Sequence, residues 1–572
     1  MRGVGVALLF LLAAAPVLAQ PRAMTPQGEL WGERVGNVDV FRGIPYAAPP
    51  VGAFRWYPTQ PGPRWDGARE ATEFGPRCQQ RDRSSRNVEV VLGLQGVGWI
   101  GRQAVRLMTA LSPPPRISED CLYLNVQTLH LDGGDLQPVM VWIHGGGHLN
   151  GSGSQAPYGS NALVERGVVQ VTFNYRLGAF GFLAHPALSA ESPHGVSGNY
   201  GLLDQIAALE WVQANISAFG GDPDNVTLFG ESAGGHSVGQ LMASPLARGL
   251  FHKAIAMSGI GLHSQRHLKM PLLDLPSAEE SGVALTRTLG VEPGPGAGAA
   301  LRALRGKVIR RQTGRQPPVL SPFHPVVDGW VLPRSVAEVF AAGDQAPVPL
   351  LVGTTADEAM LFVHLWVNGA SMDRTGEPLD SPEDYSRFIE DRFGSDAAAV
   401  TRLYPGDDMS TARGSMSRLM TDSYFGANAR YAAGMQRRIG QPAWLYLFDR
   451  TPPGELSSVG AIHGSDVPFL FDAFLPFAPA NDFDAALART IGDYWVAFAR
   501  TGDPNTAGRP AWPMYDPAAP EWMELGALVR AEPVERVEAY EIFDRERARG
   551  VAAVAAARAS KRPAGQSVEE LP

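Results

Sequence analysis

Val226-Thr227-Leu228-Phe229-Gly230-Glu231-Ser232-Ala233-Gly234 is the stretch of the chain that decides the fold. Its first four residues are apolar or β-branched, which is typical of a buried strand, and residues 233–243 favour a helix. The glycines two positions before and two positions after Ser232 leave room for a sharp bend between the two elements. The sequence therefore predicts that Ser232 occupies a strained strand-to-helix turn, with its hydroxyl at the start of the helix.

A second glycine-rich turn lies upstream, again directly after an apolar run. Residues 138–143 are continuously apolar and predict a buried strand, and His144-Gly145-Gly146-Gly147 follows them. Residues without side chains let backbone N–H groups approach a substrate oxygen closely. Gly146, Gly147 and Ala233, the residue after Ser232, are therefore candidate donors to the oxyanion that forms when a serine attacks a carbonyl.

Strands and helices alternate around these two turns. Leu202 to Ile216 has the apolar period of an amphipathic helix. Further strands are expected at 38–41, 168–173, 350–352 and 444–448, and mostly helical stretches at 330–343, 382–403, 412–438 and 484–501. Such alternation predicts an α/β protein with a large, mostly parallel sheet covered by helices on both faces.

A serine nucleophile needs a base, and the base in turn needs an acid to orient it. Among the histidines after Ser232, His463 stands out because it follows a strand-like run in the small-residue loop Ala461-Ile462-His463-Gly464. Two acidic residues, Asp357 and Glu358, lie just after the strand expected at 350–352. Either carboxylate could reach a histidine across the top of the sheet, so the residues alone leave both as candidates.

Composition places the chain among globular proteins and argues against nucleic acid as a partner. The 572 residues are 45% hydrophobic and 19% charged, with a net charge of −9. Residues 1–19 have a basic start, a short apolar run and a small-residue cleavage site, which predicts a signal peptide and a secreted or periplasmic protein. We expect one domain over 20–547, a flexible tail over 548–572, and no later membrane span.

The chain has only two cysteines, Cys78 and Cys121. In an exported protein an isolated pair is best interpreted as one disulfide, with two buried free thiols as the alternative. Residues 79–117 between them mix apolar residues with glycine and arginine. This segment is either an inserted lid over an apolar site or an ordinary surface loop.

Several longer motifs resemble one known family, the type-B carboxylesterases and cholinesterases, over about residues 25 to 545. The matching stretches are Phe41-Arg-Gly-Ile-Pro-Tyr-Ala47, Ser118-Glu-Asp-Cys-Leu-Tyr-Leu-Asn125, Val141-Trp-Ile-His-Gly-Gly-Gly147, Asn174-Tyr-Arg-Leu-Gly-Ala-Phe-Gly-Phe182, Gly201-Leu-Leu-Asp-Gln205, Asn215 through Gly234, Asp357-Glu358 and His463-Gly464. So many matches in one order make chance an implausible explanation. The resemblance implies the α/β-hydrolase fold and carboxylic ester hydrolysis.

The resemblance also implies roles for individual residues. It implies a catalytic triad of Ser232, Glu358 and His463, because the family uses the second acidic residue of the Asp-Glu pair. The remaining implied pairs and groups are the oxyanion donors Gly146, Gly147 and Ala233, the bridge Cys78–Cys121, an ion pair between Arg42 and Glu119, and a second layer near the histidine formed by Ser258 and Asp466.

The departures from the family pattern bear on the substrate. His148 stands where the family usually has an aromatic residue, and Val319 and Ser321 lie in the region where cholinesterases place aromatic acyl-pocket residues. The choline-binding tryptophan of the cholinesterases has no clear match, although Trp99 lies in the corresponding loop. The substrate-pocket candidates are His148, Trp99, Val319, Ser321, Leu361 and Phe362. The sequence therefore does not predict a cholinesterase. The expected substrate is a small-molecule ester that is partly apolar.

The predicted function is ester hydrolysis through an acyl-enzyme, with no cofactor and no metal. Three alternatives stay open. The leaving group could be that of an amide or carbamate, because leaving-group choice depends on loop geometry. The ester could be bulky, or it could be anionic, since six basic residues lie between positions 302 and 315. A non-catalytic binding protein of the same fold is the third. The sequence does not predict the oligomeric state.

Overall fold

The computed structural model describes most of the chain. The described residues are 20–80, 98–99, 101, 103–104, 106–107, 115–129, 131, 134–263, 265–272, 275–313, 321–360, 362, 371–372, 378–379, 381–451, 460–474 and 480–560. Residues 1–19, expected as a signal peptide, lie outside them, as does most of the expected lid between 79 and 117.

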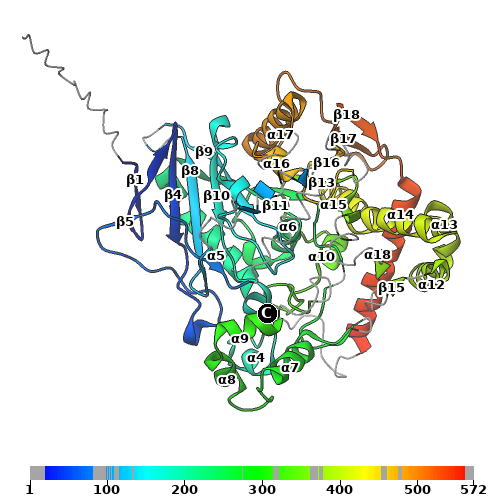
Figure 1. Cartoon of the computed structure of the whole chain (residues 1–572), viewed down its shortest axis with the longest axis horizontal. Helices are drawn as coiled ribbons and strands as arrows, with labels where there is room; N and C mark the ends of the chain where they lie inside the picture. Colours follow the sequence, from blue (N-terminus) through cyan, green and yellow to red (C-terminus); the bar gives the residue numbers. More distant parts are fainter. Residues whose placement is uncertain are drawn as a thin grey trace, which may run out of the picture.

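A single large sheet organises the described residues (Figure 1). It has 11 strands in the order β18-β17-β16-β13-β12-β11-β9-β10-β8-β4-β3. Their bounds are β3 Glu33–Val35, β4 Val38–Pro45, β8 Tyr123–Thr128, β9 Gln137–Ile143, β10 Val169–Phe173, β11 Gly221–Glu231, β12 Lys253–Met257, β13 Leu350–Thr355, β16 Ala443–Phe448, β17 Glu521–Leu525 and β18 Val529–Pro533. The central strands from β10 to β17 run parallel, and the strands at both edges pair antiparallel.

Helices cover both faces of the parallel strands. The principal ones are α5 Tyr200–Asn215, α6 Ala233–Ala243, α10 Val336–Ala342, α12 Pro382–Phe393, α13 Ala397–Leu403, α14 Met409–Met420, α15 Ala427–Arg438, α17 Asp482–Thr501 and α18 Val537–Ser560. Helix α6 packs on β9, β11 and β12, and α15 packs on β13 and β16. Helix α17 packs on β9 and β11, in the part of the molecule away from α5 and α6 (Figure 1).

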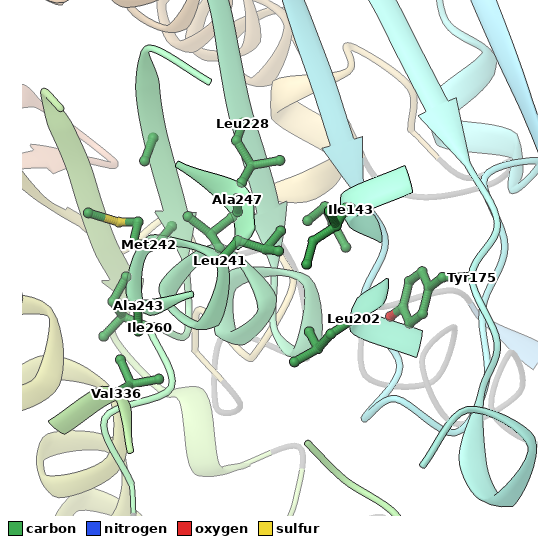
Figure 2. Packing of buried hydrophobic residues seen from close by; sticks show 14 of the residues in the cluster. Ile143, Tyr175, Leu202, Leu228, Leu241, Met242, Ala243, Ala247, Ile260 and Val336 are labelled. Atoms are coloured by element: carbon green, nitrogen blue, oxygen red, sulfur yellow. The ribbon is translucent and has the colours of Figure 1, made fainter. Parts of the chain in front are cut away.

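The alternating side chains of the strands divide the core into two layers. Val141 and Ile143 of β9 belong to the larger hydrophobic cluster, together with Leu241 of α6. Trp142, the residue between them, belongs to the second cluster with Trp495 of α17. This is the period-2 pattern of a strand that is buried on both faces. Figure 2 shows part of the first layer, where Leu241 of α6 lies below Leu228 and between Met242 and Ile143.

The expected fold class is confirmed, and the main elements lie where the sequence places them. The strand expected at 138–143 is β9, and the helix expected at 233–243 is α6 with the same bounds. The helical stretches at 382–403 and 412–438 are each divided into two α-helices. The strand expected at 226–229 is longer, since β11 begins at Gly221.

The C-terminal region differs from the sequence-based expectation of a tail after residue 547. Helix α18 continues through Ser560, and Arg558 near its end pairs with the carboxylate of Glu338 at 2.9 Å. Glu338 lies in the first turn of α10 and is itself buried. Residues 548–560 therefore form a helix that contacts the domain, while 561–572 lie outside the described residues.

Cys78 and Cys121 form a disulfide, with their Cα atoms 5.0 Å apart. The bridge joins residues separated by 43 positions. In the chain-entropy model, closing a loop of this length stabilises the folded state by about 4 kcal/mol. The bridge thus holds the two ends of the 79–117 segment close together.

The prediction of an ion pair between Arg42 and Glu119 is wrong. Arg42 pairs with Glu33, and Glu119 instead receives both arms of Arg55, with Nε at 2.6 Å and Nη2 at 2.7 Å. Arg55 reaches Glu119 because the 3-10 turn at 52–54 directs the buried guanidinium inward, where it also donates to the carbonyl oxygen of Leu304. A bidentate, buried arginine is the stronger partner for a carboxylate.

No helix formed by the described residues is both long enough and apolar enough to cross a bilayer.

Candidate active site

Ser232 lies between β11 and α6, at the turn that the sequence predicts. Its backbone has φ 58° and ψ −122°, a conformation that residues with side chains rarely adopt. Such strain costs about 1–3 kcal/mol and persists only where neighbouring contacts hold it. Here the Ser232 N–H donates to the carbonyl oxygen of Met257 at 2.9 Å, and its own carbonyl oxygen accepts from the His236 N–H at 2.8 Å. The side chain stays partly accessible to solvent.

The glycines that flank Ser232 allow α6 to approach the sheet. A Cβ on Gly234 would lie 2.0 Å from the carbonyl oxygen of Ile143, at the end of β9. A Cβ on Gly230 would lie 2.7 Å from the carbonyl carbon of Gly234. Any side chain at either position would push the helix away from the strands. The two glycines of the motif are therefore needed for close packing as well as for the bend.

Free backbone donors point to an oxyanion site. Among the described residues, none accepts a hydrogen bond from the backbone N–H of Gly146, Gly147 or Ala233. Gly146 and Gly147 have φ values of 106° and 63°, which few residues other than glycine adopt. Ala233 is the first residue of α6, where a helix leaves its N–H groups unpaired. These three N–H groups are available to hold a negatively charged oxygen.

Glu358 and His463 are in direct contact. Nδ1 of His463 hydrogen-bonds Oε2 of Glu358, and the carboxylate is completely buried. Its other oxygen, Oε1, accepts from the hydroxyl of Thr354 at 2.7 Å and from the backbone N–H of Thr355 at 2.8 Å. Both threonines end β13. The carboxylate is thereby held in one orientation, which fixes the plane of the imidazole ring and leaves Nε2 on its far side.

Asp357, the second candidate acid, has a different place. Its Oδ2 accepts from the backbone N–H of Ala461 at 2.9 Å, and its own N–H donates to the Ala461 carbonyl oxygen at 2.9 Å. Asp357 thus ties the loop that carries His463 to the end of β13, while Glu358 contacts the ring itself. The two adjacent acids, which the residues alone could not separate, contact different groups.

Nε2 of His463 faces Glu231 at 3.2 Å from Oε1, yet neither atom has a hydrogen-bond partner among the described residues. No hydrogen bond joins Nε2 to the Ser232 hydroxyl in the part of the chain that the structure describes. Catalytic hydrogen bonds are often long in the absence of substrate and tighten when it binds. The nitrogen that would act as a base is therefore uncommitted and lies beside the residue that precedes Ser232.

The electrostatics of this group are dominated by burial and by mutual charge. Burial lowers the pKa of His463, but the charges of Glu231 and Glu358 outweigh burial and raise it above its usual value. Burial raises the pKa of Glu231, and the positive charge of His463 opposes this. Burial would also raise the pKa of Glu358, but the charge and hydrogen bond of His463 bring it below its usual value. Glu358 is therefore the carboxyl group of the three whose ionised form is most strongly favoured.

Asp466 and Ser258, expected as a second layer, are both buried close to this group. Oδ2 of Asp466 accepts from the Tyr446 hydroxyl at 3.0 Å, and burial, together with the charge of Glu358, raises its pKa. Ser258 has φ 49° and donates its backbone N–H to the carbonyl oxygen of Gly353 at 2.9 Å. Its hydroxyl is among the groups that lower the pKa of Glu358.

An aromatic pair packs against the catalytic candidate His463. The ring centroids of Phe362 and Phe425 lie 4.8 and 5.4 Å from the imidazole, and the two phenyl rings stack at 6.0 Å. Phe425 belongs to a π-helical turn, η8 (Thr421–Gly426), that joins α14 to α15. The hydroxyl of Thr421, at the start of this turn, accepts from the Ala359 N–H at 3.1 Å, just after Glu358. Wide helical turns of this kind are frequent at functional sites.

The remaining pocket candidates are placed differently from one another. Phe362 lies against the ring of His463, and His148 is buried beside the oxyanion glycines. Ser321 is also buried, with its hydroxyl accepting from the Phe323 N–H at 3.3 Å. Trp99 is 68% exposed. Val319 and Leu361 lie outside the described residues.

Sequence reasoning missed three features of the site. It did not single out Glu231, although this residue lies inside the quoted motif, and it did not identify Phe425 or His236.

The first basic residue of the 302–315 group, Arg302, pairs with Glu191 at 2.6 Å and donates to the Arg55 carbonyl oxygen, so it is committed to the fold.

Comparisons with known proteins identify the family to which the chain is similar. The model of the Carboxylesterase family matches residues 19–540. The chain is 35% identical to a fumonisin B1 esterase of Sphingopyxis macrogoltabida over 92% of its own length and 91% of that protein. It is 34% identical to a para-nitrobenzyl esterase of Bacillus subtilis (strain 168) over 89% and 95% of the two chains. A solved PNB esterase structure superposes with a TM-score of 0.74 at 32% identity, covering 92% of this chain and all of that one.

Proposed function

The chain belongs to the carboxylesterase family and is a carboxylic ester hydrolase, and we propose that it acts through Ser232, His463 and Glu358. One observation carries the assignment of residues: the partly accessible Ser232 directly follows Glu231, whose carboxylate faces Nε2 of the buried His463–Glu358 pair at 3.2 Å, and three unpaired backbone donors belong to the same turns. Together these supply a nucleophile, a base and an oxyanion site.

In the proposed reaction the Ser232 oxygen attacks the ester carbonyl carbon, and its proton passes to Nε2 of His463. The oxyanion that forms is held by the N–H groups of Gly146, Gly147 and Ala233, each of which contributes about 3 kcal/mol of transition-state stabilisation. His463 then donates its proton to the leaving alcohol, which departs and leaves an acyl group on Ser232. Water, activated by the same nitrogen, releases the acid.

Glu358 keeps its negative charge throughout this cycle. Its hydrogen bond to Nδ1 holds the proton of the neutral ring on that nitrogen, so that Nε2 is free to accept the serine proton. The imidazolium that forms is stabilised by the same carboxylate. The two threonine donors at the end of β13 prevent Glu358 from rotating away. Glu358 therefore orients and stabilises, and does not itself take the proton.

A panel of p-nitrophenyl esters from acetate to palmitate, with p-nitroacetanilide as the amide, tests this function. We expect turnover of esters, an initial burst of p-nitrophenol as the acyl-enzyme accumulates, and much slower cleavage of the amide. A fluorophosphonate should label the protein on the tryptic peptide that contains Ser232. If the purified protein neither turns over any ester nor takes the label, the proposed function is wrong.

The pH dependence should be set by the carboxylates around His463. Only the neutral ring can accept the Ser232 proton, and nearby negative charge raises the pKa of the ring. The acidic limb of the kcat/KM profile should therefore lie above pH 6.5, the ordinary value for histidine. In Glu231→Gln, one of these charges is removed, the pKa of His463 falls, and the limb should move to lower pH. The measurement is kcat/KM for p-nitrophenyl butyrate between pH 5 and 9.

The matched control for this prediction is Asp224→Asn, a change of an exposed acid outside the site. It removes the same charge from the protein and should leave the limb where it is, because solvent screens a distant charge. An acidic limb that stays in place in Glu231→Gln would mean that Glu231 is uncharged in the resting enzyme. Its charge would then have no part in raising the pKa of His463.

We also propose that residues 1–19 are removed on export and that the enzyme is secreted or periplasmic. The disulfide between Cys78 and Cys121 supports an oxidising compartment, since such bridges are rare in reducing ones. Sequencing the N-terminus of the exported protein checks this, with Gln20 as the expected first residue and a retained Met1 as the contrary result.

A further inference from the structure

Histidines gather around the start of helix α6, beyond the one that serves the triad. His236 lies one helical turn after Ser232, and the ring centroid of His263 is 4.8 Å from its own. The rings of His148 and His324 are 6.1 Å apart. The charges of His263, His148, His463 and His324 all act on His236. These four side chains, His148, His236, His263 and His324, form the histidine cluster.

The hydrogen bonding of His236 decides which of its nitrogens can donate. Nδ1 accepts a hydrogen bond from the backbone N–H of Gly261 at 2.8 Å, so this nitrogen carries no proton. In the neutral ring the proton must then be on Nε2. Nε2 forms no hydrogen bond with any residue that the structure describes. His236 therefore offers an unused N–H donor close to the nucleophile.

Two members of the cluster are accessible from solvent. His263 is exposed and His236 is partly exposed, and yet burial among surrounding protein atoms lowers the pKa of both rings. His148 differs, because it is buried and its Nε2 lies 3.1 Å from the Ser237 hydroxyl. His236 and His263 are thus the members that a bound molecule could touch.

The charge environment of the cluster contrasts with that of His463. Three carboxylates act on His463. The leading influences on the pKa values of His148, His236 and His263 among the described residues are burial and other histidines, and no carboxylate is among them. The described residues also include no group of three or more His, Cys, Asp or Glu side chains arranged to hold a metal ion. The accessible rings of the cluster therefore present N–H donors, and no carboxylate is among the groups that act most strongly on them.

The reaction geometry relates the histidine cluster to one half of the ester. The leaving alcohol must depart next to Nε2 of His463, because it takes its proton from there. The aromatic pair Phe362 and Phe425 packs against the His463 ring. The histidine cluster instead includes His236 of α6 and His148, the residue that follows the oxyanion glycines. The acyl half of the ester is left to extend toward the cluster.

We propose that His236 and His263 form an acyl subsite that binds a carboxylate, so that the preferred substrates are esters of dicarboxylic or polycarboxylic acids. This inference rests on the proposed function and specifies its substrate class. A carboxylate at this place would accept the Nε2–H of His236 and a proton-bearing nitrogen of His263. Hydrogen bonds to a charged acceptor are about twice as strong as those between neutral groups.

The test compares two esters that differ only at the end of the acyl chain. Mono-p-nitrophenyl adipate ends in a carboxylate, and p-nitrophenyl hexanoate ends in a methyl group on a chain of the same length. The measured quantity is the preference, the ratio of kcat/KM for the adipate to that for the hexanoate at pH 7. In the native enzyme this preference should exceed one. It should come mainly from a lower KM for the adipate, with kcat nearly the same for both esters, because the carboxylate is bound equally in the ground state and in the transition state.

Variants then locate the preference. In His236→Leu and in His263→Leu we expect the preference to fall about tenfold or more, the loss of one hydrogen bond to a charged group. His236→Gln keeps an N–H donor and should restore part of the preference that His236→Leu loses. His194→Leu is the matched control, since His194 is exposed and stacks on Trp330 outside the cluster.

The outcomes separate this inference from the function on which it rests. If the native enzyme hydrolyses the hexanoate but the preference is one or less, the proposed subsite is wrong and the esterase function stands. The same conclusion follows if the leucine variants leave the preference unchanged. An equal loss on both esters in the leucine variants, with no recovery in His236→Gln, indicates only a structural role and also overturns it. Absence of turnover on both esters in the native enzyme removes the proposed function and this inference together.

Discussion

The Ser232→Ala variant is expected to lose ester hydrolysis almost completely, with kcat lower by at least about 10⁴-fold. Without the hydroxyl no acyl-enzyme can form, so the burst of p-nitrophenol and the fluorophosphonate label should both disappear. The change removes one oxygen from a partly accessible side chain whose backbone is held by hydrogen bonds at both N–H and carbonyl. The fold should therefore persist, and circular dichroism with thermal unfolding checks that it does.

Ser217→Ala provides the control for this variant, because Ser217 is an exposed serine in the 3-10 turn Ile216–Phe219. It should keep native kinetics and native labelling. Residual activity in Ser232→Ala must be distinguished from trace wild-type enzyme by titrating active sites with the fluorophosphonate. A folded Ser232→Ala protein that still shows burst kinetics and takes the label would assign the nucleophile to another residue.

The second large effect is expected in Glu358→Gln. The amide keeps the shape of the side chain but can donate as well as accept, so it no longer fixes the proton of His463 on Nδ1. The ring then adopts the wrong tautomer for part of the time, and its imidazolium form loses its counter-charge. We expect kcat to fall by about 10³–10⁴-fold, with little change in KM. Steady-state kinetics on p-nitrophenyl butyrate measure both constants.

The adjacent Asp357→Asn makes the same chemical change one residue earlier in the chain. Its amide oxygen can still accept from the Ala461 N–H, so the loop that carries His463 keeps its tie to β13. The loss of kcat should stay within about tenfold, as for the loss of part of one hydrogen bond. Equal losses in the two variants, or a larger loss in Asp357→Asn, would contradict the division of roles between the two acids.

The fold was predictable from the sequence wherever periodicity and glycine placement act locally. The run 138–143 and the motif around Ser232 each predict a buried strand followed by a tight turn, and both predictions are confirmed. Strand β12 is not evident from the sequence, because Lys253-Ala-Ile-Ala-Met257 contains a lysine and two small residues. It is a strand because it pairs with β11 and β13 on its two sides, a condition that no short stretch of sequence records.

The candidate site was predictable to the extent that each residue carries its own local pattern. Ser232 and the oxyanion glycines are recognisable one by one. The choice of Glu358 over Asp357 needed the resemblance to a family, since nothing in their local sequence separates two adjacent acids. The histidine cluster could not be predicted, because His148, His236, His263 and His324 are far apart in the chain and meet only when the sheet and α6 bring their segments together.

The π-helical turn at Thr421–Gly426 has a consequence for how this enzyme could acquire new specificities. Phe425 packs against His463 from one continuous helical segment, α14–η8–α15, in which α14 and α15 both have buried residues. A wide turn of this kind contains one residue more than an ordinary turn, so a single-residue deletion there would rotate every later residue of the segment about its axis. Natural or laboratory evolution of leaving-group preference is therefore expected to proceed by side-chain exchange at position 425, and to avoid changes in length.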